Sequence, residues 1–149
     1  MRVLLVCSGN TCRSPMAGAL LQGLWRGDEQ LEVLTAGTST VHGLPATTHA
    51  VTAMQERGLD LGAHRSQPVT PALLKSVDLV LTMTVSHREA LRAQFPAMAN
   101  KIHTLAEYAG SARDVSDPFG GPLDEYRRTA QSLAELLSAA ISRMQRKES

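Results

Sequence analysis

The chain has 149 residues, of which 43% are hydrophobic and 19% are charged, and its formal net charge is +1 at pH 7. This length predicts a single domain, residues 1–149, and the near-neutral charge argues against nucleic acid or an anionic membrane as a partner. No apolar stretch is long enough to cross a membrane and no leader-like segment is visible, so we expect a cytoplasmic protein. The two cysteines, Cys7 and Cys12, stand in one loop, which suits a reducing compartment.

Strand-like and helix-like patterns alternate along the chain. The patterns predict strands at 1–6, 31–36, 77–83 and 101–105, and helices at 16–26, 46–57, 70–75, 84–94 and from 123 onward. This alternation predicts an α/β fold: a single-domain three-layer sandwich with a parallel sheet of about four strands and helices on both faces. Ligands of such sheets bind at the carboxyl ends of the strands.

The first predicted strand leads into the segment Cys7-Ser8-Gly9-Asn10-Thr11-Cys12-Arg13-Ser14-Pro15. Ser14 is the expected N-cap of the following helix, and Pro15 its first helical residue. Gly9 and Asn10 suit a positive φ. A loop between a strand and a helix directs its N–H groups and the positive end of the helix dipole into one concavity, which favours an oxyanion such as phosphate. A Walker-type nucleotide loop is excluded because no Gly-Lys-Ser/Thr follows.

Cys7 stands at the mouth of this loop and is the candidate nucleophile, because the field that attracts a phosphate also favours a thiolate. Arg13 can present two parallel N–H donors to two oxygens of a phosphoryl group. Ser14 can donate its hydroxyl to the Cys7 sulfur, both at rest and when the thiolate departs. The alternative interpretation of Cys7 is a buried structural thiol at the end of a strand.

Hydrolysis through a phosphocysteine needs a proton donor for the leaving group and then a base for the attacking water. We select Asp117 in the long loop at 110–122, because Pro118 biases its backbone toward an extended conformation and Phe119 could wall the leaving group. Asp114 and Asp124 remain alternatives, although a loop turn and a helix dipole also explain them.

The five histidines show no metal-ligand spacing, so we expect no metal and no cofactor. His64, next to Arg65, is the histidine that we place near a functional loop. Its alternative interpretation is an ordinary surface residue.

The Cys7–Pro15 segment, together with Asp117-Pro118, resembles the low-molecular-weight protein tyrosine phosphatases. The similarity extends over the whole chain and includes the 36–39 loop and the 77–81 strand. Thr11 and Phe119-Gly120-Gly121 shift the resemblance toward the bacterial protein-arginine phosphatases. Tyrosine-specific members have Ile or Leu in place of Thr11 and an aromatic pair after Asp-Pro. The resemblance therefore implies phosphorylated protein substrates with phosphoarginine preferred, and Thr11 and Phe119 as specificity residues.

The resemblance also implies roles for individual residues. Cys7 is expected to be the nucleophile, Arg13 the phosphate clamp, and Asp117 the general acid and then base. Cys12 corresponds to a second loop cysteine that can form a reversible disulfide with the nucleophile, although it could also simply pack under the loop. Asn10 is expected to hold the loop in shape with Ser39 as its partner. The residues expected to bind phosphate or support the loop are Ser8, Gly9, Asn10, Thr11, Cys12, Ser14 and Ser39.

Three other functions remain to be weighed. A phosphotyrosine phosphatase would use the same loop and acid. A thioredoxin-coupled arsenate reductase would need further cysteines outside the loop, and this chain has none. A non-catalytic phosphate-binding or redox-sensing module would have no need of Asp117.

Overall fold

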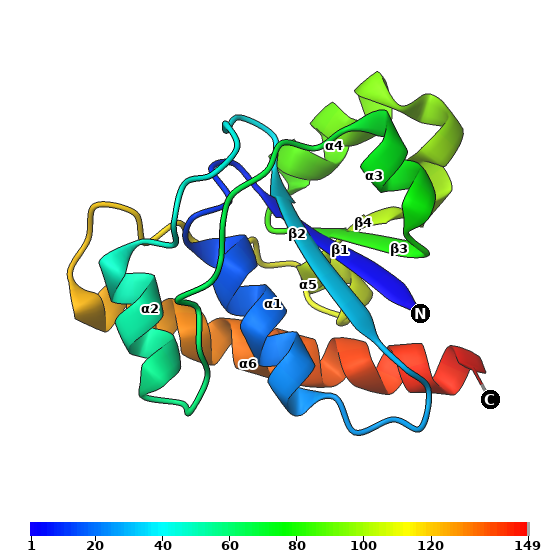
Figure 1. Ribbon diagram of the computed structural model, residues 1–149. Helices are drawn as coiled ribbons and strands as arrows, with labels where there is room; N and C mark the ends of the chain where they lie inside the picture. Colours follow the sequence, from blue (N-terminus) through cyan, green and yellow to red (C-terminus); the bar gives the residue numbers. More distant parts are fainter. Residues whose placement is uncertain (149) are drawn as a thin grey trace.

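The computed structural model describes residues 1–148. Strands and helices alternate over most of the chain (Figure 1). The elements are β1 (Arg2–Cys7), α1 (Arg13–Leu24), β2 (Glu32–Gly37), α2 (Thr48–Gln55), α3 (Pro71–Ser76), β3 (Leu79–Thr82), α4 (Val85–Gln94), the 3-10 helix η1 (Pro96–Lys101), β4 (Ile102–Thr104), α5 (Leu105–Tyr108) and α6 (Leu123–Glu148).

The four strands form one parallel sheet in the order β2-β1-β3-β4. β1 is an interior strand, and Leu4 in its middle is paired with Leu34 of β2 and Val80 of β3. The predicted α/β class and the four-stranded parallel sheet are therefore confirmed. Because β2 and β3 lie on opposite sides of β1, the connections that leave the sheet diverge at the carboxyl end of β1. This end of a parallel sheet is where ligands bind in such folds.

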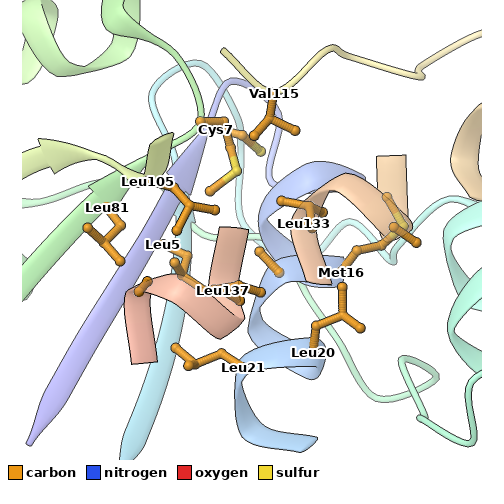
Figure 2. Close-up of a cluster of buried hydrophobic side chains, with 14 of the residues drawn as sticks. Leu5, Cys7, Met16, Leu20, Leu21, Leu81, Leu105, Val115, Leu133 and Leu137 are labelled. Atoms are coloured by element: carbon orange, nitrogen blue, oxygen red, sulfur yellow. The ribbon is translucent and has the colours of Figure 1, made fainter. Parts of the chain in front are cut away.

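Two hydrophobic layers enclose the sheet. Val3, Leu5 and Cys7 of β1 belong to a cluster with α1, α2 and α6, whereas Leu4 and Val6 belong to a second cluster with α3 and α4. Figure 2 shows part of the first cluster, with Cys7 at its edge, near Val115. Each fully buried leucine stabilises the fold by roughly 1.5–3 kcal/mol. The packing on both faces therefore fixes the end of β1, from which the loop after Cys7 begins.

The predicted elements are present, with ends that differ by one to a few residues. Threonines cap two of the middle helices: the side chains of Thr70 and Thr84, which stand at the predicted starts of these helices, accept hydrogen bonds from the first turns of α3 and α4. The expected N-cap role of Ser14 is wrong. Helix α1 begins at Arg13 with Cys12 as its N-cap residue, because the Ser14 hydroxyl is engaged by groups inside the loop.

The end of β2 lies directly against the loop that follows β1. A Cβ on Gly37 would lie 2.5 Å from the backbone oxygen of Ser8, so only glycine fits at this position. The amide of Thr38 donates to the carbonyl of Cys7 at 2.9 Å. Strand β2 therefore supports the loop from one side. No helix within residues 1–148 is long and apolar enough to cross a membrane.

Candidate active site

The loop between β1 and α1 is held by residues outside it, whose amides donate hydrogen bonds to the carbonyl groups of the loop. The carbonyls of Cys7, Ser8 and Thr11 accept from the amides of Thr38, Ser39 and Thr47 at 2.9 to 3.0 Å. Peptide planes whose oxygens point outward turn their N–H groups inward, and the first amides of α1 face the same way. The loop therefore has the outward carbonyls that an anion-binding nest of the predicted kind requires.

The Cys7 sulfur lies inside this nest and meets two polar groups. The Asn10 amide donates to Cys7 Sγ at 3.3 Å, and Ser14 Oγ lies 2.9 Å from the sulfur. Cys7 is only 3% exposed, yet it lines a pocket of about 490 Å³ that is open to solvent. The sulfur therefore has two polar neighbours inside the loop, and Cys7 is reached from the pocket.

The orientation of the Ser14 hydroxyl follows from Asn10. Asn10 Oδ1 accepts from the amide of Gln67 at 3.0 Å, which leaves Nδ2 to donate to Ser14 Oγ at 2.8 Å. Since Ser14 Oγ accepts from Asn10, its own hydrogen is free to point at Cys7 Sγ. The expected partnership of Asn10 with Ser39 is wrong, because both functional groups of the Asn10 side chain are occupied by Ser14 and Gln67. Ser39 supports the loop through its backbone amide instead.

Asn10 also has an unusual backbone. Its φ is +57°, and it is the one non-glycine residue among those described that has a positive φ. Asparagine tolerates this conformation better than most residues. The expected positive φ in this part of the loop is therefore confirmed at Asn10, whereas Gly9 does not adopt one.

Replacing Asn10 should destabilise the protein. We expect Asn10→Ala to lower the free energy of unfolding by about 2 to 4 kcal/mol, because it strains the backbone and leaves the Gln67 amide without its acceptor. Asn10→Gly is the matched control, because glycine adopts the positive φ without strain but, like alanine, lacks the amide side chain. Urea denaturation measures both. A loss below about 1 kcal/mol for Asn10→Ala would contradict the role of the side chain in shaping the loop.

Arg13 lies at the start of α1 with its side chain 6% exposed. One terminal nitrogen, Nη1, donates to the carbonyl of Val115 at 3.0 Å, and the other, Nη2, lies 3.5 Å from Asp117 Oδ2. Arg13 Nε is buried and has no hydrogen-bond partner, and no other buried side-chain nitrogen or oxygen among the described residues lacks one. A buried guanidinium N–H without a partner is costly. An oxyanion is the kind of acceptor that would satisfy this N–H.

Asp117 reaches the pocket from the long loop that precedes α6. Its side chain is 49% exposed, and Oδ1 accepts from the amide of Phe119 at 3.1 Å. The two alternative acids have other partners. Asp114 Oδ1 accepts from the amide of Val85 at the start of α4, and Asp124 forms an ion pair with Arg127. Asp117 is therefore the carboxylate of the three that lines the same pocket as Cys7.

The pocket brings together most of the residues that the sequence singles out. Thr11 and Ser39 line it beside Cys7, and Phe119 stands at its edge, 70% exposed. Asn10 and Ser14 are buried and do not line the pocket, but they contact Cys7 and each other through hydrogen bonds. A larger groove of about 790 Å³ runs between the 110–122 loop and α6, but neither Cys7 nor Arg13 lines it. The smaller pocket is therefore the candidate active site.

Cys12 is buried and also lines the pocket, and its sulfur lies among hydroxyl groups. Its sulfur lies 3.5 Å from Tyr126 Oη and 3.5 Å from Thr47 Oγ1. Burial raises the pKa of Tyr126 to about 12, and the hydrogen bond with Cys12 acts in the same direction. Tyr126 therefore keeps its proton, and its hydroxyl can donate a hydrogen bond to Cys12 Sγ. Both cysteines are free thiols.

Two histidines contact the loop, and the sequence pointed to one of them. His64 Nε2 donates to the carbonyl of Asn10 at 2.7 Å, which confirms the expectation that His64 lies near a functional loop. His87 Nε2 lies 2.7 Å from Ser8 Oγ and was not anticipated. Burial is the main cause that lowers the pKa of both residues. No group of His, Cys, Asp and Glu side chains within residues 1–148 is arranged to hold a metal ion.

The parallel α/β fold and the cysteine set in an anion-binding loop define a cysteine-based phosphate site. Comparison with known proteins identifies the family: the family model "Low molecular weight phosphotyrosine protein phosphatase" matches residues 2–149 of this chain. The chain belongs to this family, whose members hydrolyse phosphate from proteins, and the resemblance seen in the sequence is confirmed.

Three relatives are especially similar. The protein-arginine-phosphatase of Bacillus subtilis (strain 168) is 45% identical over 139 residues, which are 92% of each chain. The structure of the YwlE arginine phosphatase from Geobacillus stearothermophilus has a TM-score of 0.92 at 35% identity and covers 99% of this chain and 94% of its own. A YwlE cysteine-to-serine mutant with a phosphorylated active site serine has a TM-score of 0.93 at 41% identity and covers 97% of this chain and 96% of its own.

Proposed function

We propose that this protein hydrolyses phosphoarginine in proteins through a phosphocysteine intermediate formed on Cys7. The observation that carries the proposal is the position of Thr11: it lines the same pocket as Cys7 and Arg13, in the place where an aliphatic residue would favour a flat phenyl ring. Thr11 presents a smaller, polar surface that accommodates a guanidinium. Relatives named as protein-arginine phosphatases support the same substrate.

The first chemical step follows from the contacts in the pocket. The phosphoryl group lies in the loop and takes hydrogen bonds from the amides and from Arg13, whose Nε then has a partner. Cys7 Sγ attacks phosphorus in line, an S–P bond forms, and the P–N bond to the guanidine breaks. Asp117 gives its proton to the departing nitrogen. The loop amides stabilise the charge on the phosphoryl oxygens during transfer.

The second step returns the enzyme to its starting state. Asp117, now a carboxylate, removes a proton from water, and the water oxygen attacks phosphorus. The S–P bond breaks and inorganic phosphate forms. Ser14 Oγ and the Asn10 amide, which both contact Cys7 Sγ, stabilise the departing thiolate. The structural relative that holds a phosphoryl group on an active site serine supports a covalent intermediate at this position.

Substitution of Thr11 tests the substrate preference. We expect the wild type to prefer a phosphoarginine peptide over the matched phosphotyrosine peptide in kcat/KM. Thr11→Ile should shift this ratio toward phosphotyrosine by about 10-fold or more, because one added methylene in a pocket changes discrimination by roughly 1–3 kcal/mol. Steady-state kinetics on the two peptides give the ratio directly.

Two further variants separate the size of Thr11 from its polarity. Thr11→Val keeps the shape but removes the hydroxyl, and Thr11→Ser keeps the hydroxyl but removes the methyl group. If polarity decides, Thr11→Val follows Thr11→Ile and Thr11→Ser follows the wild type. An unchanged ratio in Thr11→Ile would contradict the assignment of Thr11 as a specificity residue.

A phosphotyrosine phosphatase is the second candidate function. The observation in its favour is the apolar side of the pocket, where Val41, Leu44 and Phe119 are exposed and could contact an aromatic ring. The family name points the same way. The peptide comparison described above distinguishes the two substrates.

We further propose that Cys12 protects Cys7 from irreversible oxidation. A peroxide converts the Cys7 thiolate to a sulfenic acid, and attack by the Cys12 thiolate forms a disulfide with release of hydroxide, which leaves as water. The Tyr126 and Thr47 hydroxyls lie 3.5 Å from Cys12 Sγ and hold the sulfur in the same loop as Cys7. Such a cycle requires a reducing compartment for recovery, which favours the cytoplasm.

A further inference from the structure

A short chain of hydrogen bonds connects helix α4 to the phosphate-binding loop. Ser8 Oγ lies 2.7 Å from His87 Nε2, and His87 Nδ1 lies 2.9 Å from Thr84 Oγ1. Thr84 is the N-cap of α4, and its Oγ1 also accepts from the backbone amide of His87 at 3.2 Å. His87 is 8% exposed, so its ring is fixed by the protein. The reaction steps described above do not use either Ser8 Oγ or His87.

The surroundings of His87 keep its imidazole neutral. Burial lowers its pKa most, and the nearby charge of Arg13 lowers it further. The carboxylates of Asp114 and Asp117 oppose this effect, but with smaller contributions. A neutral imidazole has one N–H and one acceptor nitrogen. When Nδ1–H donates to Thr84 Oγ1, Nε2 accepts the hydrogen of the Ser8 hydroxyl, and the lone pairs of Ser8 Oγ are left for another donor.

Ser8 and Thr11 are held by elements that pack on opposite faces of the sheet. Ser8 is held by His87 of α4, whereas the Thr11 carbonyl is held by Thr47, the N-cap of α2. Helices α2 and α4 pack on opposite faces of the sheet (Figure 1). Both Ser8 and Thr11 line the pocket that contains Cys7. The pocket that contains the nucleophile is therefore lined by two hydroxyl-bearing residues that are held from opposite faces of the sheet.

We propose that Ser8 is a specificity-determining residue whose hydroxyl oxygen accepts a hydrogen bond from the guanidinium N–H groups of the substrate, and that His87 is the positioning residue that orients it. This inference rests on the proposed phosphoarginine activity. A phosphorylated guanidinium carries several N–H donors around one plane, whereas a phenyl ring carries none. An oriented acceptor therefore favours phosphoarginine over an aryl phosphate. Thr11 and Ser8 then both select the substrate.

The test compares the selectivity of matched variants. For each variant, kcat/KM is measured on a phosphoarginine peptide and on p-nitrophenyl phosphate, and the ratio of the two is the readout. We expect Ser8→Ala to lower this ratio about 10-fold, as expected for losing one hydrogen bond to a charged group. His87→Leu should lower it to a similar extent. The double variant Ser8→Ala/His87→Leu should lower it no further, because His87 acts through Ser8.

Two conservative variants provide the rescue. Ser8→Thr keeps the hydroxyl, and His87→Gln offers an amide oxygen within reach of Ser8 Oγ. Both should restore the ratio to within about 3-fold of the wild type, since the hydrogen bond is retained. A purely structural role of His87 would lower activity on both substrates together and leave the ratio unchanged. Urea denaturation of each variant identifies losses that come from unfolding.

The outcomes separate this inference from the proposed function. If the wild type hydrolyses the phosphoarginine peptide efficiently but the ratio is the same in Ser8→Ala, the Ser8 assignment is overturned and the proposed function stands. If Ser8→Ala and His87→Leu lower the ratio additively, His87 does not act through Ser8, which overturns the positioning role. If the wild type hydrolyses only the aryl phosphate, the proposed function itself is overturned, and this inference with it.

Discussion

Cys7→Ser should abolish turnover on every phosphorylated substrate. We expect kcat to fall by at least about 10³-fold, because a serine hydroxyl in the same place is not ionised and is a poor leaving group in the second step. The anion-binding loop itself should survive, because its carbonyls are held from outside by β2 and α2, and Asn10 and Ser14 hold each other. Phosphate should therefore still bind. Initial-rate assays with isothermal titration of inorganic phosphate measure both effects.

Cys12→Ser is the matched control for this experiment. Cys12 lies in the same loop, is equally buried and lines the same pocket, but its sulfur lies beside the Tyr126 and Thr47 hydroxyls, whereas that of Cys7 lies beside Ser14 and the Asn10 amide. We expect this variant to keep kcat within roughly 10-fold of the wild type, since the serine hydroxyl can take over the hydrogen bonds. Comparable activity of Cys7→Ser and the wild type would contradict the nucleophile assignment. If Cys12→Ser lost most of its kcat and Cys7→Ser did not, Cys12 would be the nucleophile instead.

Asp117→Asn should produce the second largest loss. We expect kcat to fall by about 10²- to 10⁴-fold on a phosphoarginine peptide, the usual contribution of a general acid–base residue. The loss should be smaller on an aryl phosphate with an activated leaving group, because such a group departs without a proton. The amide oxygen of asparagine still accepts from the Phe119 amide, so the loop geometry is retained. Single-turnover kinetics on both substrates resolve the first step.

Asp114→Asn is the corresponding control in the same loop. Asp114 accepts from the Val85 amide, and an asparagine oxygen can do the same. This variant should change kcat only slightly. An equal loss on substrates with good and poor leaving groups in Asp117→Asn would show that Asp117 does not protonate the leaving group.

Most of the fold could be predicted from local patterns. The buried strands at Arg2–Cys7 and Leu79–Thr82 have the continuous apolar character of a parallel sheet, and the caps at Thr70 and Thr84 mark the helix starts. The helix start at α1 was misplaced because Ser14 has the sequence signature of an N-cap, but its hydroxyl is used by Cys7 and Asn10. The order of strands depends on the paths of the connections and leaves no local signal.

The core of the candidate site could also be predicted, because the nucleophile and the clamp lie in one short segment and the acid precedes a proline. The contacts that support these residues could not be predicted. Asn10 meets Gln67, Ser8 meets His87, and Cys12 meets Tyr126 across 57, 79 and 114 residues of chain. Such pairs are created by tertiary packing. The capping position of Thr84, three residues before His87, was the only nearby signal, and it indicates a helix start, not a partner for Ser8.

The most direct test of the central claim is to identify the residue that carries the phosphoryl group during turnover. The Asp117→Asn variant, whose second step lacks its base, is mixed with p-nitrophenyl phosphate, because this activated leaving group departs without the proton of Asp117. The reaction is quenched rapidly under conditions that preserve S–P bonds, and the protein is digested and examined by mass spectrometry. The account predicts one added phosphoryl group on the peptide that contains Cys7, located at the Cys7 sulfur and absent in a Cys7→Ser/Asp117→Asn double variant. A phosphoryl group on Cys12 or on a histidine, or turnover without any covalent adduct, would contradict it.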